Sequence, residues 1–375
     1  MLKKLFPIIR KLIYIVLLTI FLIVMAALKN NPDVCEAFTR GPARWYGRVA
    51  SFISGLVPFL SLTEMTFILL ASLLVFLVFL TIRNLVKLQL FKAASHLLTI
   101  PSVVLLVISS YVFSCELAYN RKKMPLPYYE QQVFREDFIP IYNYFADDLN
   151  ACLSQLSFKE NGALIGLSLD EINKEVKKAY QIVNDSYFHT YVGAAKPMLS
   201  SFIYREFQIT GVTFSPLGEA NINTLNTSED IPFSLAHELA HTKGVMREDD
   251  ANQLAFYVCL NSDNPYLRYS AYSRYFYQIQ MIGSGSYLTN EELAQCHKVD
   301  AAYSKNLSYQ RKYWKDHDLL TKVGDFFNDL YIKSSGVEEG TQSYSGGTEH
   351  EFDPTTNKLY PSMYQKLFFE KYYRS

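Results

Sequence analysis

Three long apolar runs dominate the first third of the chain. They cover residues 12–28, 65–82 and 97–115, and none contains a charged side chain. Each run approaches the length of roughly 20 residues that an α-helix needs to cross the hydrocarbon of a bilayer. The pattern therefore predicts three membrane-spanning helices, which form a membrane anchor over residues 1–119. A cleaved signal peptide is the alternative for the first run, but the run is long for one and ends in a poor cleavage site.

The pattern changes after residue 119 to mixed apolar and polar segments, typical of a folded domain outside the bilayer. Residues 120–375 are predicted to form a mainly helical, α+β domain with a small β-sheet. Residues 202–204 and 211–214 are short β-branched and aromatic runs around a turn, and both are predicted as strands.

Basic residues around the apolar runs predict the orientation of the anchor. The positive-inside rule places the N-terminus and the loop between the second and third runs in the cytoplasm. With three spans, everything from about residue 116 onward then lies outside the cytoplasm. The basic residues that favour this orientation are Lys3, Lys4, Arg10, Lys11, Arg83, Lys87 and Lys92. Those that oppose it are Lys29, Arg40, Arg44, Arg48, Arg121, Lys122 and Lys123.

Residues 38–60, between the first two runs, combine aromatic and basic side chains. Trp45 and Tyr46 lie among Arg44 and Arg48, a mixture that suits a membrane interface. A short re-entrant segment at residues 54–58 and an ordinary loop are the alternatives.

Composition excludes several classes of function. The 36 basic and 36 acidic residues cancel and no basic run stands out, so nucleic acid is not an expected partner. The five cysteines are scattered without paired spacing, so they predict neither a cysteine metal site nor a disulfide framework. The sequence does not indicate the oligomeric state.

The candidate chemistry lies at residues 237–241, which read His237-Glu238-Leu239-Ala240-His241. Positions i and i+4 of a helix share one face, so the two imidazoles can bind one Zn²⁺. Glu238 can then serve as general base for a water activated by the metal. Acidic residues and a proline at 229–232 favour a helix start, and Gly244 favours its end. The alternative is an ordinary helix with two surface histidines.

A catalytic zinc takes a third protein ligand and keeps one position for water. The acidic residues Glu248, Asp249 and Asp250 follow the motif and open a second apolar helix. A third histidine in the metzincin spacing would fall at position 247, but Arg247 occupies it and cannot bind a metal.

The fragment Glu248-x-x-Ala251-Asn252-x-x-Ala255 resembles the helix that supplies the glutamate ligand in gluzincins. The resemblance implies Glu248 as the third ligand, with a small Ala251 letting two helices approach. A helix-start acid is the alternative role for Glu248, and Asp249 and Asp250 are the fallback ligands.

In zincins, the strand before the motif helix often forms an edge that binds an extended peptide. Residues 218–224 precede the helix here, and Glu219 and Asn221 are candidates for that rim. Turn residues are the alternative for both. Tyr344, on a Gly- and Ser-rich loop, is a further candidate for polarising a scissile carbonyl.

The chain resembles a bacterial membrane-protein family known as domain of unknown function 3810. The segments that carry the likeness are residues 54–59, 117–121, 218–223, 232–255, 328–333 and 343–344. Proteins of that family are regarded as zinc metallopeptidases of unestablished substrate. The resemblance implies a multi-pass protein of the bacterial cell membrane with an extracytoplasmic, gluzincin-like domain.

The expected function is that of a membrane-anchored zinc metallopeptidase that hydrolyses a peptide or protein substrate. His237, His241 and Glu248 are the expected ligands of one Zn²⁺, and Glu238 is the expected general base. The lipid bilayer is the other expected partner. The alternative function is a catalytically inactive, zincin-like binding or receptor protein at the cell envelope.

Overall fold

The computed structural model describes residues 2–183, 186–188, 193–334 and 337–375. Two compact units share the chain. The first contains Met1–Lys123 together with the later segment Phe214–Glu219, and the second contains Met124–Thr213 and Ala220–Ser375. The segment Phe214–Glu219 joins the first unit through contacts distant in sequence, which no local pattern marks.

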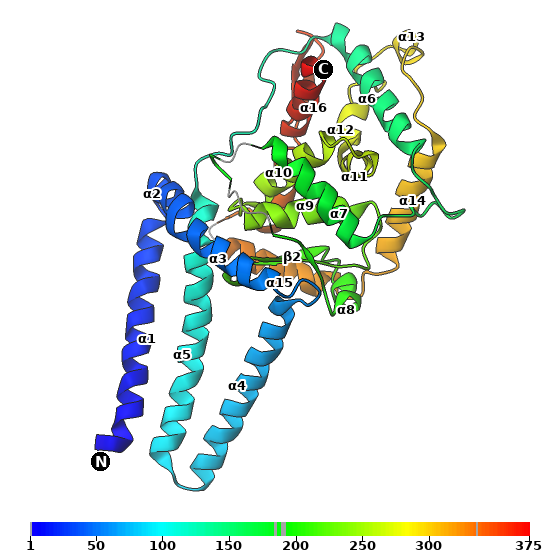
Figure 1. The fold of residues 1–375 in the computed structure, drawn as a ribbon. Coiled ribbons are helices and arrows are strands. Elements are labelled where there is room, and N and C mark those ends of the chain that lie inside the picture. Colours follow the sequence, from blue (N-terminus) through cyan, green and yellow to red (C-terminus); the bar gives the residue numbers. More distant parts are fainter. Residues whose placement is uncertain (1, 184–185, 189–192, 335–336) are drawn as a thin grey trace. The chain divides into compact units, whose positions relative to one another are not determined.

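Three long helices form the body of the first unit (Figure 1). They are α1 (Leu2–Leu28), α4 (Leu62–Val86) and α5 (Leu90–Ser114), and each is long and apolar enough to cross a membrane. The three predicted apolar helices are therefore confirmed, with longer ends than the charge-free runs suggested. A polar contact joins two of them: the ammonium of Lys11, just before the first run, donates to the Ser95 carbonyl at 2.7 Å and to the Thr99 hydroxyl at 2.6 Å.

Shorter helices connect the spans at one end of the first unit (Figure 1). After α1 come α2 (Pro32–Phe38), a π-helical turn η1 (Thr39–Ala43) and α3 (Arg44–Gly55), and η2 (Glu116–Asn120) follows α5. The buried Glu36 carboxylate joins two of these pieces, because it accepts hydrogen bonds from Arg121 at 2.9 Å and from Arg40 at 2.6 Å.

The second unit is mainly helical with small sheets, as expected. Its helices are α6 (Phe138–Leu153), α7 (Leu169–Ala179), α8 (Ser201–Glu206), α9 (Asp230–Thr242), α10 (Glu248–Leu260), α11 (Pro265–Tyr275), α12 (Tyr277–Gln280), α13 (Asn290–Leu293), α14 (Ala301–Lys315), α15 (Thr321–Ser334) and α16 (Met363–Arg374). Short helical turns are η3 (Arg135–Asp137), η4 (Tyr180–Ile182), η5 (Ser215–Leu217, in the returning segment) and η6 (Gly340–Ser345).

Two small sheets accompany the helices. One has the order β1-β3-β2, formed by β1 (Lys196–Pro197), β2 (Gly211–Phe214) and β3 (Glu219–Ile222), with β1 parallel to β3. The other pairs β4 (Glu351–Asp353) with β5 (Lys358–Tyr360) in antiparallel fashion.

One strand prediction is confirmed and one is wrong, and a predicted edge strand lies in the middle of its sheet. Residues 211–214 form β2 as predicted, but residues 202–204 lie in helix α8. A three-residue apolar run fits either element, because periodicity does not separate helix from strand at that length. Residues 218–224 were expected to form an edge, yet β3 is the central strand, because the two-residue strand β1 pairs with its other side.

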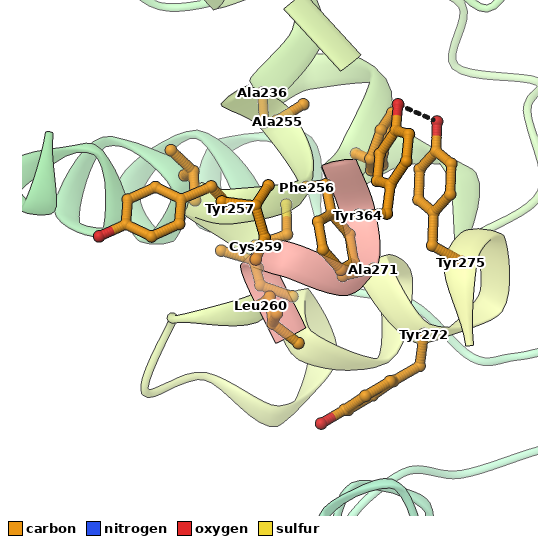
Figure 2. Close-up of a cluster of buried hydrophobic side chains, with 14 of the residues drawn as sticks. Ala236, Ala255, Phe256, Tyr257, Cys259, Leu260, Ala271, Tyr272, Tyr275 and Tyr364 are labelled. Atoms are coloured by element: carbon orange, nitrogen blue, oxygen red, sulfur yellow. Dashed lines mark hydrogen bonds between the residues drawn. The ribbon is translucent and has the colours of Figure 1, made fainter. Parts of the chain in front are cut away.

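The core of the second unit is rich in aromatic rings (Figure 2). Tyr275 and Tyr364 stack with ring centroids 3.9 Å apart, and the Tyr364 hydroxyl donates to the Tyr275 hydroxyl at 3.0 Å. Phe256 of α10 meets both rings edge-on at 5.3 and 5.4 Å. These contacts fix α10 in the core, which matters because α10 begins with Glu248.

Candidate metal centre

Helix α9 carries the two histidines and is anchored at its first residue. The buried Asp230 carboxylate accepts hydrogen bonds from the Thr227 hydroxyl at 2.7 Å, the Arg274 guanidinium at 3.0 Å and the Trp314 indole at 3.0 Å. A negative charge at this end also suits the helix dipole. The predicted start of the motif helix is thus confirmed, and the helix is held rigidly at the end opposite to His241.

Gly244 ends the helix, as predicted, and the turn that it makes orients one imidazole. Its φ of 83° lies in the left-handed region that glycine enters without strain. The turn brings the Val245 carbonyl to 2.8 Å from His241 Nδ1. A proton on Nδ1 donated to this carbonyl leaves the Nε2 lone pair available, which is the arrangement found at metal-binding histidines.

Helix α10 brings Glu248 to the two histidines. The helices α9 and α10 pack directly against each other, and buried alanines on both, such as Ala236 and Ala255, keep the side chains between them small (Figure 2). Ala251 is also fully buried. Because Glu248 is the first residue of α10, its carboxylate reaches the imidazoles across the short turn between the helices.

Three donor atoms converge at this point. His237 Nε2 lies 3.1 Å from His241 Nε2 and 3.1 Å from Glu248 Oε2, and His241 Nε2 lies 3.6 Å from the same oxygen. Zinc bonds of about 2.0–2.1 Å at tetrahedral angles place donor atoms about 3.3 Å apart. The two nitrogens and one oxygen therefore match, in type and spacing, three corners of a zinc tetrahedron.

Burial and charge also fit a cation. All three side chains are buried, and Glu248 Oε2 accepts no hydrogen bond from the residues that the structure describes. Burial by itself raises the pKa of Glu248, but His241 and His237 hold it far below its usual range. Burial lowers the pKa of His241, whereas the facing Glu248 carboxylate raises it overall to about 9. A buried carboxylate of this kind favours a positive charge between the imidazoles.

Glu238 is held from the other side by strand β2. The Thr213 hydroxyl donates to Glu238 Oε2 at 2.7 Å. A Cβ atom on Gly211 would lie 2.5 Å from Glu238 Cγ, so the strand can pass this close only because residue 211 is glycine. Burial raises the pKa of Glu238, while the two histidines and the Thr213 hydrogen bond lower it. The carboxylate thus has a fixed position beside the three donors.

The sequence match to known families covers both units. A family model described as "Protein of unknown function (DUF3810)" matches residues 38–349. The chain belongs to the DUF3810 family. No curated protein and no solved structure matches the chain. The matched range includes α4, α5 and the donors on α9 and α10.

The fallback ligands of this DUF3810 protein are engaged elsewhere. Asp249 accepts hydrogen bonds from the Arg247 guanidinium at 3.2 and 3.1 Å, and Arg247 Nε lies 3.9 Å from an Asp250 oxygen. Among the residues that the structure describes, the group of possible metal donors found here consists of His237, His241 and Glu248.

The remaining sequence candidates make hydrogen bonds of their own. Glu219 belongs to the first unit, where its buried carboxylate accepts hydrogen bonds from Ser54 and Thr63. Asn221 is buried in β3 and donates to the Val212 carbonyl. Tyr344 has its backbone carbonyl bound by Asn252 of α10 at 3.1 Å, and its hydroxyl accepts from Asn328 at 3.3 Å.

Sequence reasoning missed Gly211, Thr213 and Val245. A glycine and a threonine at a strand start carry no motif, and Val245 contributes only its backbone carbonyl. The single available signal was Gly244, whose turn determines where that carbonyl points.

Proposed function

We propose that this DUF3810 protein is a membrane-anchored, zinc-dependent metallopeptidase. The observation that carries the proposal is the convergence of His237 Nε2, His241 Nε2 and Glu248 Oε2 at tetrahedral spacing, with Glu238 fixed beside them. Three protein donors leave one position for water, as in catalytic rather than structural zinc sites.

Each residue has a distinct role in the proposed reaction. His237, His241 and Glu248 hold Zn²⁺, which when bound acts as a Lewis acid and lowers the pKa of a water to about 7. Glu238 takes a proton from the attacking water and delivers it to the departing amine. Thr213 keeps the Glu238 carboxylate oriented, and the Val245 carbonyl keeps His241 in the tautomer that offers Nε2.

Strand β2 is the proposed place for the substrate backbone. It is at one edge of its sheet, and both Gly211 and Thr213 lie beside Glu238. An extended peptide paired along β2 would carry its scissile bond past the base. The proposed substrate is accordingly a peptide or an extended segment of a protein.

The proposed location is the bacterial cell membrane, with a cytoplasmic N-terminus and the metal centre outside the cytoplasm. The three apolar helices support membrane association. The orientation rests on the basic residues that precede the first apolar run and on those between the second and third runs. A protease-cleavable tag after residue 375 should be removed by protease added to intact spheroplasts, and protection of the tag would reject this orientation.

The activity is tested with the full chain in lipid nanodiscs and a library of fluorescence-quenched peptides. Wild type with one zinc per chain should cleave members of the library, and Glu238→Gln should retain zinc but lose cleavage, because an amide accepts no proton from water. Glu291→Gln is the matched control, since Glu291 is exposed on α13. Cleavage by Glu238→Gln at the wild-type rate would reject the role of Glu238.

A further inference from the structure

One face of helix α3 is apolar and exposed. Trp45, Val49, Phe52, Ile53 and Leu56 recur every three to four residues, which places them on one side of the helix. Their exposed fractions are 69%, 40%, 62%, 57% and 66%. Exposed apolar residues are ordinary when scattered, but a contiguous row of large ones marks a surface that binds something.

The opposite face of α3 is polar and buried. The Ser51 hydroxyl donates to the Gly218 carbonyl at 2.6 Å, and the Ser54 hydroxyl donates to the Glu219 carboxylate at 2.6 Å. The Tyr46 hydroxyl donates to the Pro216 carbonyl at 2.7 Å. In a helix on a water-exposed surface the apolar face points inward and the polar face outward. Helix α3 has the reverse arrangement, so its outer face is adapted to an apolar medium.

Glu219 shows how firmly the inner face is held. Besides the Ser54 bond, its carboxylate accepts the Thr63 backbone N–H and the Thr63 hydroxyl, both at 2.9 Å. Thr63 is the second residue of α4. These buried bonds tie α3 to the first turn of a candidate span through one carboxylate, which prevents α3 from rotating its apolar row inward.

Ring contacts place α3 at the ends of the spans. Tyr46 meets Phe113 edge-on with centroids 5.5 Å apart, and Phe113 is the penultimate residue of α5. The chain leaves α3 at Gly55 and enters α4 at Leu62. With 12 residues, α3 is too short to cross the roughly 30 Å of hydrocarbon at about 1.5 Å per residue.

We propose that α3 is an interfacial helix that lies in the plane of the bilayer surface and inserts this apolar row among the phospholipid chains. The candidate spans α4 and α5 also expose large apolar side chains, for example Leu69 and Leu106. Arg48, the exposed charged residue of α3, is basic, which suits lipid phosphates. Trp45 is a residue type enriched at that boundary. The inference is independent of the metal centre.

Tryptophan quenching in nanodiscs tests the proposal with the full chain. The lipids carry bromine either near the ester carbonyls or near the ends of the acyl chains. The chain contains two tryptophans, Trp45 and Trp314, so Trp45→Phe supplies the emission of Trp314 alone for subtraction. Interfacial helices lie roughly 5–10 Å below the headgroup level, so the Trp45 emission should be quenched more by shallow bromine than by deep bromine.

Two results would overturn the proposal. Stronger quenching by deep bromine would indicate a re-entrant segment, and no quenching of Trp45 by either lipid would mean that protein covers the row. In the latter case, Phe52→Asp should convert a dimer of the chain to monomers, which would identify a second copy as the occupant. A different pair of results is quenching of Trp45 by shallow bromine and a Phe52→Asp chain that still folds and binds lipid as before. That pair of results would show that the row as a whole, and not Phe52 alone, carries the insertion.

Discussion

Replacing Gly211 by alanine tests whether strand β2 positions the proposed general base. The added Cβ would lie 2.5 Å from Glu238 Cγ, 2.6 Å from Oε1 and 2.8 Å from Cδ. Carbon atoms normally approach to about 3.5–4.0 Å. Either β2 or the Glu238 side chain must therefore move by about 1 Å, and both are held by the Thr213 hydrogen bond.

The expected loss follows from that displacement. A misplacement of about 1 Å at a catalytic group costs about 100-fold in rate, which corresponds to about 2.7 kcal/mol of transition-state stabilisation. The three atoms nearest to the new methyl group all belong to Glu238, and none of them is a metal donor. Gly211→Ala should therefore lose kcat/KM for peptide hydrolysis and keep one zinc per chain.

Gly285→Ala is the matched control. A Cβ at residue 285 would meet only Leu293 Cδ1 at an ordinary 3.6 Å, so zinc content and kcat/KM should stay at wild-type values. Both variants are compared with wild type in the same nanodiscs by peptide hydrolysis and by metal analysis. Wild-type kcat/KM in Gly211→Ala would refute the argument that β2 fixes Glu238.

Two further predictions concern protons. Thr213→Val removes a hydrogen bond to the Glu238 carboxylate that lowers its pKa, so the acidic limb of the kcat/KM profile should move up by about one pH unit; an unmoved limb would contradict this. Glu229 is fully buried, and burial raises the pKa of its carboxyl from 4.5 to about 7. The native state then holds a proton that the unfolded chain has released, so the free energy of unfolding falls by about 3 kcal/mol as the pH rises from 4.5 to 7. Glu229→Gln should flatten that fall in urea unfolding at pH values across this window, and an equally steep fall would show that other groups cause it.

The membrane helices and the histidine motif were predictable because a local pattern determines each. A charge-free run such as residues 65–82 must form a helix to cross a bilayer, because the hydrocarbon offers its backbone no hydrogen-bond partners. Positions 237 and 241 share a face in any α-helix. The ends of the spans were less predictable, because the helices continue into flanking polar residues, such as Lys11 of α1 and Ser95 of α5, which contact each other.

The rest of the site depends on packing between segments distant in sequence. From the sequence, Glu248 could be chosen over Asp249 as the third ligand only because its helix resembles the ligand helix of gluzincins. The structure adds that Asp249 is bound to Arg247. The contact of Thr213 with Glu238 spans 25 residues and leaves no local pattern. The edge of the sheet was misassigned because β1 consists of two residues, Lys196 and Pro197, that no strand signal marks.

Glu219 illustrates the same limit in the membrane unit. Its position before the motif helix suggested a role in substrate binding, but its carboxylate binds Ser54 and Thr63. These partners precede it by 165 and 156 residues. A charged side chain in a strand is expected to face solvent. Only the tertiary structure reveals that this carboxylate is buried and that serine and threonine hydroxyls donate hydrogen bonds to it.

The measurement that tests the central claim most directly is the zinc content of the purified full chain by mass spectrometry. The proposed centre predicts one zinc per chain in wild type and in Asp249→Ala, and loss of zinc in Glu248→Ala, because Glu248 approaches both imidazoles whereas Asp249 is bound to Arg247. A folded wild-type chain that binds no zinc when the metal is supplied would contradict the proposed metal centre. Zinc retained by Glu248→Ala but lost from Asp249→Ala would contradict the ligand set.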